Sequence, residues 1–124
     1  MPNHKILVVD DSRHSRDLLV EALASPGYEF ATANDGSQAI EQAELFDPDL
    51  VLMDLQMPGM DGYEALAALR AIPRFQSLRA IAVTAHVLDS DRRRALAAGF
   101  DGFLPKPVNL SFLRTYVAQL LNRP

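Results

Sequence analysis

The sequence contains no cysteine, which excludes disulfide bonds and thiolate metal sites. It also lacks an apolar run near the roughly 18 residues that a spanning helix needs. Residues 1–5 lead directly into a short apolar stretch, and they lack the longer apolar region of a signal peptide. Positive charge is not in excess, because the formal net charge is -4, and this argues against nucleic acid as a direct partner. We therefore expect a cytoplasmic domain that contacts neither membrane nor nucleic acid.

The composition is that of an ordinary globular domain. Hydrophobic residues make up 48% of the chain and charged residues 23%, which is not the composition of a disordered segment. A length of 124 residues fits one domain with a single core, and no repeat or linker divides the chain. The sequence predicts one domain over residues 1–124.

The segment 50–62 has the most informative pattern. Four apolar residues precede Asp54, and such a short run is typical of a strand buried on both faces of a parallel sheet. Pro58, Gly59 and Gly62 then interrupt regular structure, so a loop follows the carboxylate. Asp54 is therefore expected at the carboxyl end of a central strand, where open α/β sheets bind their ligands.

Further apolar segments alternate with helical ones along the rest of the chain. We predict the other strands at residues 6–9, 28–33, 80–83 and 102–104, with 28–33 more peripheral because its pattern alternates. Five helices are expected, beginning after Ser12, after Asp35, at Gly62, at Ser90 and after Asn109. Two pairs three residues apart resemble capping boxes, Asp35 with Gln38 and Asp61 with Glu64. This alternation predicts an α/β fold whose parallel sheet has right-handed crossovers.

Four of the predicted strands stop at polar residues, namely Asp10-Asp11, Asp54, Thr84 and Lys106. A parallel sheet places all its carboxyl ends at one edge, so these side chains can converge there. Crowded carboxylates repel each other, and one pKa would rise unless a cation intervened. Oxygen ligands without histidine or cysteine suit Mg²⁺, while a lysine and a hydroxyl could hold phosphoryl oxygens. The pattern indicates a metal-assisted phosphoryl-transfer site with a carboxylate available as nucleophile.

These motifs make the chain similar to a response-regulator receiver domain of two-component signalling. The matching features are Asp10-Asp11, the sequence MDLQMPGMDG around Asp54, Thr84-Ala85 and Lys106-Pro107. The resemblance implies a flavodoxin-like three-layer sandwich of five βα units, with strand order 2-1-3-4-5 and the site above strands 1, 3 and 4. The pairing of MDLQMPGMDG with TAHVL and KPVNL is closer to receivers of hybrid kinases and phosphorelays than to those joined to DNA-binding domains.

The resemblance also assigns roles to the residues at the strand ends. Asp54 would be the phosphoacceptor, forming an acyl phosphate with a phosphoryl group from a histidine kinase or a histidine phosphotransfer protein. Asp11 would coordinate Mg²⁺ directly and Asp10 through bound water, while Gln56 would supply its backbone carbonyl as a further metal ligand. Lys106 would pair with a phosphoryl oxygen.

A switch is implied as well. Thr84 matches the switch hydroxyl and Phe103 the switch aromatic, and Pro107 stands where the family has a cis peptide bond. The downstream protein would bind a face formed by the fourth helix, the fifth strand and the fifth helix, to which the run 92–94 of arginines can contribute. His86, two residues after Thr84, is a candidate for tuning hydrolysis of the acyl phosphate.

Simpler interpretations and other functions compete with this one. Asp54 could be a cap or turn residue, Asp10-Asp11 could cap the first helix, and Phe103 could be a core aromatic. A phosphatase with an aspartyl nucleophile is disfavoured because Gln56 stands where such enzymes carry a second acid. An FMN-binding domain is disfavoured because its phosphate would meet Asp10-Asp11. A pseudo-receiver that only binds proteins remains the alternative that retains the fold.

Beyond its own phosphorylation and dephosphorylation, no enzymatic activity is expected. Two arrangements stay open, a stand-alone regulator that acts by protein contact and a receiver that is part of a larger hybrid kinase, and Met1 leans toward the first.

Overall fold

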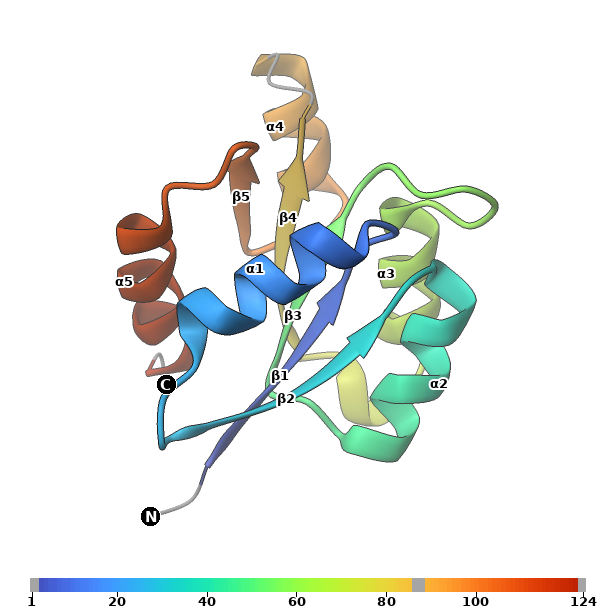
Figure 1. The fold of residues 1–124 in the computed structure, drawn as a ribbon. Helices are drawn as coiled ribbons and strands as arrows, with labels where there is room; N and C mark the ends of the chain where they lie inside the picture. The colour runs from blue at the N-terminus through green and yellow to red at the C-terminus, as the bar shows by residue number, and fades with distance from the viewer. Residues whose placement is uncertain (1–2, 86–88, 123–124) are drawn as a thin grey trace.

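The computed structural model describes residues 3–85 and 89–122, and within them strands and helices alternate (Figure 1). The elements are β1 (His4–Val9), α1 (Arg13–Leu23), β2 (Tyr28–Ala33), α2 (Gly36–Phe46), β3 (Leu50–Asp54), α3 (Gly62–Arg70), the 3₁₀ helix η1 (Pro73–Phe75), β4 (Arg79–Thr84), α4 (Asp89–Ala97), β5 (Gly102–Pro105) and α5 (Leu110–Leu121). Each predicted strand and helix is present. The 3₁₀ helix was not predicted, and Pro73 stands at its first position rather than at the end of α3.

The five strands form one parallel sheet in the order β2-β1-β3-β4-β5, which confirms the predicted fold class and strand order. Every residue of β3 is buried, whereas β2 at the edge is mostly partly exposed. The prediction that residues 28–33 form a peripheral strand is therefore confirmed. A continuous apolar run is buried on both faces only in the interior of such a sheet.

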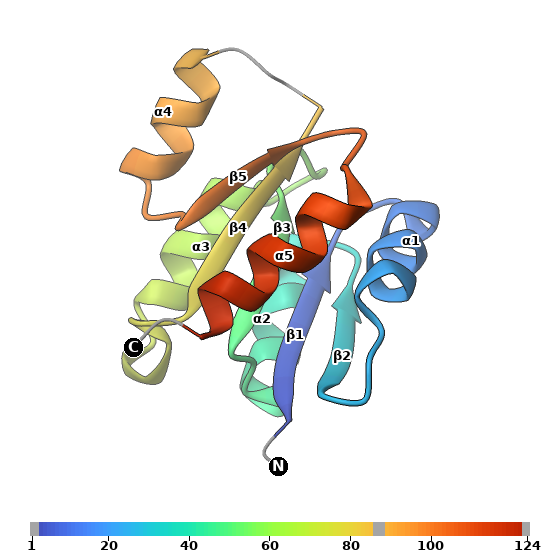
Figure 2. The ribbon, with the colours of Figure 1, turned by 90° about the vertical axis from the view of Figure 1, so that its left-hand side faces the viewer.

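Helices cover both faces of the sheet and produce two apolar cores (Figures 1 and 2). On one face, Ile6 and Leu52 pack with Leu19 of α1 and Leu113 of α5. On the other face, the alternate strand residues pack against α2, α3 and α4; they include Leu7, Val9, Val51, Met53 and Ala82. Successive side chains of a strand point to opposite faces, so each apolar strand supplies both cores. This three-layer arrangement holds the carboxyl ends of the strands in a rigid frame.

Side-chain caps fix where the helices begin. Ser12, Asp35, Asp61 and Asn109 each accept a hydrogen bond from a backbone N–H in the first turn of the following helix. Asp61 and Glu64 form the predicted capping box. The second predicted box is only half formed, because the Gln38 side chain accepts from the N–H of Asn34 rather than from that of Asp35. None of the helices in the described residues is long and apolar enough to cross a bilayer.

Arg70, at the end of α3, joins three segments that lie apart in the sequence. Its Nη1 donates to the carbonyl oxygens of Gln76, at 3.0 Å, and of Leu78, while its Nη2 donates to Gly99 at 2.8 Å. The Asp101 carboxylate lies 3.6 Å from Nη2 and accepts from the N–H of Ala80 at 2.8 Å. One guanidinium group therefore ties the end of α3 to the turns that precede β4 and β5.

Replacing Arg70 by alanine should lower the free energy of unfolding by about 2–3 kcal/mol, because hydrogen bonds to a charged group are among the stronger ones. Chemical denaturation followed by circular dichroism measures this loss. Arg93 is an exposed arginine on α4 and provides the control, since Arg93→Ala should change stability by less than about 0.5 kcal/mol. Equal losses in the two variants would contradict a clamping role for Arg70.

Candidate phosphoacceptor and metal site

The polar residues at the strand ends meet at the carboxyl edge of the sheet. Asp10 follows β1 directly, Asp54 is the last residue of β3, Thr84 is the last of β4, and Lys106 follows β5. The strand register aligns these ends, because Val9 pairs with Met53. The convergence predicted from the sequence is thus present in the structure.

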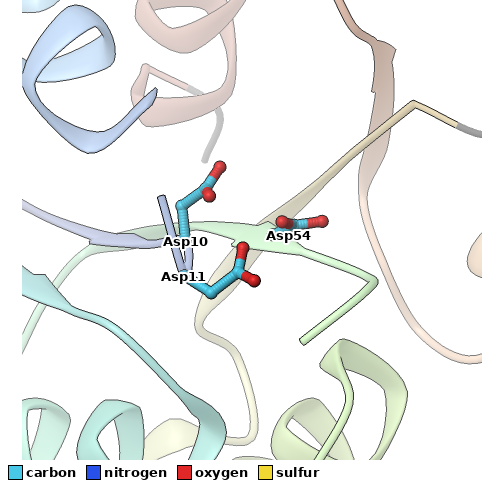
Figure 3. A group of neighbouring side chains, drawn as sticks. All are labelled: Asp10, Asp11 and Asp54. Carbon is cyan, nitrogen blue, oxygen red and sulfur yellow. The ribbon is translucent and has the colours of Figure 1, made fainter. Parts of the chain in front are cut away.

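Asp10, Asp11 and Asp54 form a compact acidic cluster (Figure 3). One carboxylate oxygen from each lies within 4.8 Å of the others, a spacing at which the group could hold a metal ion. Asp10 and Asp54 are 1% and 5% exposed, whereas Asp11 is exposed. The cluster therefore has two buried oxygen donors and one that faces solvent.

Lys106 places its ammonium group between the two buried carboxylates. Its Nζ lies 2.8 Å from Asp10 Oδ2 and 3.4 Å from Asp54 Oδ2. The backbone N–H of Lys106 donates to the Thr84 carbonyl oxygen at 2.8 Å, which fixes the chain at this point. The Lys106–Pro107 peptide bond is cis, as the sequence resemblance implied.

Backbone N–H groups hold the remaining carboxylate oxygens. Ser12 N–H donates to Asp10 Oδ1 at 2.9 Å, and Gln56 N–H donates to Asp54 Oδ1 at 3.0 Å. Arg16 of α1 adds a contact that the sequence analysis missed, since its Nη1 donates to the Asp10 carbonyl oxygen at 2.7 Å. No pattern in the sequence indicates this contact, because it depends on how the first turn of α1 lies over the end of β1. Both buried acids are therefore fixed in orientation before any ligand binds.

Burial raises the pKa of the Asp54 carboxyl above its usual value, and the negative charge of Asp10 adds to this effect. The Gln56 N–H and the charge of Lys106 act in the opposite direction and only partly offset burial. The sequence predicted a raised pKa from repulsion between carboxylates. The direction agrees, but loss of solvation is the larger cause.

Burial lowers the pKa of the Lys106 ammonium group. The hydrogen bond that the ammonium group donates to Asp10 and the negative charges of Asp54 and Asp10 outweigh that effect, so the net shift of the Lys106 pKa is upward. Lys106 therefore remains charged at neutral pH and acts as the fixed cation of the site.

The raised pKa of Asp54 predicts that its charge destabilises the metal-free protein. A carboxyl group with a folded-state pKa above its unfolded value of 3.8 favours folding when protonated, and this contribution is lost as the pH rises through the folded-state pKa. We therefore expect Asp54→Asn to have a higher free energy of unfolding than the unchanged protein at about pH 7, in EDTA. The difference should shrink as the pH falls below the raised pKa of Asp54. Urea titrations at several pH values measure it, and a less stable variant at neutral pH would contradict the expectation.

Thr84 and Phe103 lie on the same face of the sheet. Ala82 pairs with Phe103, and Thr84 is two residues further along β4, so the side chains of all three point toward the layer of α3 and α4. Thr84 is 1% exposed and Phe103 6% exposed. The Arg92 guanidinium of α4 lies 5.4 Å from the Phe103 ring centroid and covers it. His86 lies outside the described residues.

The donor set of the acidic cluster fits Mg²⁺. All three side chains supply carboxylate oxygens, which hard divalent cations prefer. The partly exposed position of the cluster leaves room for the waters that Mg²⁺ retains. Lys106 neutralises part of the negative charge in the absence of a metal ion.

The fold and the site together define a class of protein: a flavodoxin-like α/β domain with an acidic cluster and a lysine at the carboxyl edge of its sheet. The sequence profile described as "Response regulator receiver domain" matches residues 6–118. The chain belongs to this family.

Known relatives include a sensor histidine kinase and a response regulator, in which the matched segment makes up different shares of the protein. The chain is 40% identical over 118 residues to the sensor histidine kinase RcsC of Salmonella typhimurium. The matched segment covers 95% of this chain but only 12% of the kinase. It is 38% identical over 119 residues to the response regulator MprA of Mycobacterium leprae, covering 96% of this chain and 51% of that protein. The chain thus spans about half or less of the length of these two relatives.

Solved structures confirm the fold over nearly the whole chain. A putative response regulator from Chloroflexus aurantiacus has a TM-score of 0.91 at 30% identity, covering 98% of this chain and 99% of that one. The chemotaxis response regulator CheY4 of Vibrio cholerae has a TM-score of 0.88 at 30% identity, covering 95% of this chain and 98% of that one.

Proposed function

We propose that this chain is a phosphorylation-controlled switch in which Asp54 accepts a phosphoryl group. The donor is the phosphohistidine of a histidine kinase or a histidine phosphotransfer protein, and the reaction depends on Mg²⁺. Phosphorylation then alters binding to a downstream protein in the cytoplasm. The observation that carries the proposal is the Lys106 ammonium group, which lies between Asp10 and Asp54 beside a cluster of three carboxylates.

The transfer step requires one bond to form and one to break. A carboxylate oxygen of Asp54 attacks phosphorus, the O–P bond forms, and the N–P bond of the phosphohistidine breaks with its electron pair going to the imidazole. Asp54 Oδ1 accepts from the Gln56 N–H at 3.0 Å, whereas Oδ2 accepts from Lys106 Nζ at the longer distance of 3.4 Å, so we propose Oδ2 as the attacking oxygen. Asp54 Oδ2 is also the oxygen nearer to Lys106, which can follow the incoming phosphoryl group.

The acidic residues divide the remaining roles. Asp11 and Asp54 would hold the metal ion directly, with the Gln56 carbonyl, while Asp10 would act through bound water. This division agrees with the surroundings of the two acids. Both carboxylate oxygens of Asp10 already accept hydrogen bonds, from Lys106 and from the Ser12 N–H, whereas Asp11 is exposed. When bound, Mg²⁺ would supply positive charge to the phosphoryl oxygens.

Thr84 and Phe103 are the proposed link from the acceptor to the partner surface. The Thr84 hydroxyl would bind a phosphoryl oxygen, and the space it leaves would admit a shift of the Phe103 ring. A groove of about 360 Å³ lies next to this ring on the face formed by α4, β5 and α5. Arg92, Phe112 and Tyr116 also line it, and the last two rings stack with centroids 5.4 Å apart. This face is the proposed binding surface for the downstream protein.

A labelling experiment tests the proposal. The protein is incubated with phosphoramidate and Mg²⁺, and intact-mass spectrometry followed by peptide mapping locates the added phosphoryl group. We expect one group per chain, on Asp54, and loss of labelling in EDTA.

The same experiment discriminates between the alternatives. Absence of labelling under conditions in which the protein is folded would favour a pseudo-receiver that only binds proteins. Multiple turnover of added phosphomonoesters would favour a phosphatase with an aspartyl nucleophile.

A further inference from the structure

The start of α3 lies directly on the strand end that carries the acceptor. The first residue of α3 is Gly62, whose N–H donates to the Leu55 carbonyl oxygen at 3.1 Å. Leu55 follows Asp54 and is itself anchored, since its N–H donates to Val83 of β4 at 3.3 Å. The loop 56–61 therefore starts from Leu55 and returns to it through Gly62.

No side chain fits at position 62. A Cβ atom there would lie 2.5 Å from the Asp54 carbonyl oxygen and 2.8 Å from the Leu55 Cα, and both are backbone atoms. Gly62 has ordinary helical backbone geometry, so lack of space, rather than a left-handed conformation, requires glycine.

The neighbouring structure leaves little freedom to relieve such a clash. Ala65, Leu66 and Leu69 of α3 are fully buried against the sheet, so the helix is held in place by its apolar face. On the other side is the Asp54–Leu55 peptide. A side chain at position 62 would therefore displace either α3 from its core or the peptide that carries the acceptor.

We propose that Gly62 is a positioning residue for the acceptor site. By bringing the first turn of α3 into contact with the Asp54–Leu55 peptide, it closes the loop 56–61 and keeps Gln56 beside the Asp54 carboxylate. It thereby sets the position of the Asp54 oxygens relative to Asp11. This inference rests on the proposed function of Asp54 and names a residue on which that function depends.

The test compares Gly62→Ala with the unchanged protein in two measurements, both at a temperature where each protein is folded. Titration with Mg²⁺, followed by ¹⁵N–¹H NMR, should show a dissociation constant at least about tenfold higher in the variant, or about 1.4 kcal/mol. Labelling by phosphoramidate at saturating Mg²⁺ should also be slower, because the acceptor oxygens remain displaced when the ion is bound.

Two control variants separate positioning from stability. A Cβ atom at Gly27 would meet nothing within 4 Å, so Gly27→Ala should match the unchanged protein in both measurements. Asp61→Ala removes the cap of α3 and should lower Tm without adding an atom beside the acceptor. An Asp61→Ala variant that weakens Mg²⁺ binding as much as Gly62→Ala would reduce the effect to helix stability and overturn the inference.

The remaining outcomes are also distinct. If the unchanged protein binds Mg²⁺ and is labelled, and Gly62→Ala has the same Mg²⁺ dissociation constant and the same labelling rate, the inference is wrong while the proposed function stands. If the unchanged protein is folded but shows neither property, the proposed function itself fails. If Gly62→Ala does not fold, the inference is tested by the NMR titration of the unchanged protein with Mg²⁺. In that titration the amide signal of Gly62 should move while that of Gly27 stays. A stationary Gly62 signal would overturn the inference.

Discussion

Asp54→Asn is expected to accept no phosphoryl group while retaining the fold. The substitution keeps the size of the side chain and an oxygen that can accept from the Gln56 N–H, but it removes the nucleophilic carboxylate. Intact-mass measurement after incubation with phosphoramidate and Mg²⁺ should detect no added group. Circular dichroism should remain unchanged, since the packing around β3 is apolar and does not depend on the charge.

The control for this variant is Asp17→Asn, which removes an exposed carboxylate from α1. It should be labelled like the unchanged protein. Labelling of Asp54→Asn at a comparable rate would place the acceptor elsewhere, and peptide mapping would then show where.

Lys106→Ala should slow phosphorylation strongly while leaving Mg²⁺ binding intact. Its ammonium group lies 3.4 Å from Asp54 Oδ2, so its loss removes the cation available to the incoming phosphoryl oxygens. Removing one charge-stabilising donor from such a site typically slows a reaction by about 100-fold or more. Mg²⁺ affinity should stay equal or rise, because the competing positive charge beside Asp10 and Asp54 is gone.

Measuring both quantities on one preparation makes this prediction decisive. The rate of labelling at saturating Mg²⁺ should fall, whereas the Mg²⁺ dissociation constant should stay the same or become smaller. Lys5 is the other lysine of the chain and lies over the Phe46 ring near the amino end of β1, away from the carboxyl edge of the sheet, so Lys5→Ala is the matched control. An equal loss of labelling and of Mg²⁺ affinity in Lys106→Ala would contradict the assigned role.

The elements that the sequence predicted well depend on local patterns. The apolar run before Asp54 has no polar residue to face solvent, and β3 is indeed buried along its whole length. Ser12, Asp61 and Asn109 cap their helices because capping involves residues only two or three positions apart. The gathering of the acids follows from one rule, that parallel strands place their carboxyl ends at the same edge of the sheet.

The features that were missed depend on distances between segments far apart in the sequence. Arg70 is an ordinary helix-terminal arginine by pattern, and its contact with Gly99 crosses 29 residues. Gly62 was predicted to interrupt regular structure after Asp54 and to begin a helix, but its contact with the Asp54 peptide was missed because that contact is a property of packing. The half-formed cap at Asp35 has a similar origin, since the orientation of the Gln38 side chain decides which N–H it meets.

The ion pair between Lys106 and Asp10 has a consequence for how phosphorylation would change the structure beyond the site. In the sheet order, β5 is separated from β1 by β3 and β4, yet the residue that follows β5 reaches Asp10 at the end of β1. A new group on Asp54 that draws Lys106 away from Asp10 would act directly on the connection between β5 and α5. In the proposed function, phosphorylation would then change the proposed partner surface by two parallel routes, one through Thr84 and β4 and the other through Lys106. A variant with Thr84 replaced by alanine would in that case keep a reduced response rather than lose it entirely.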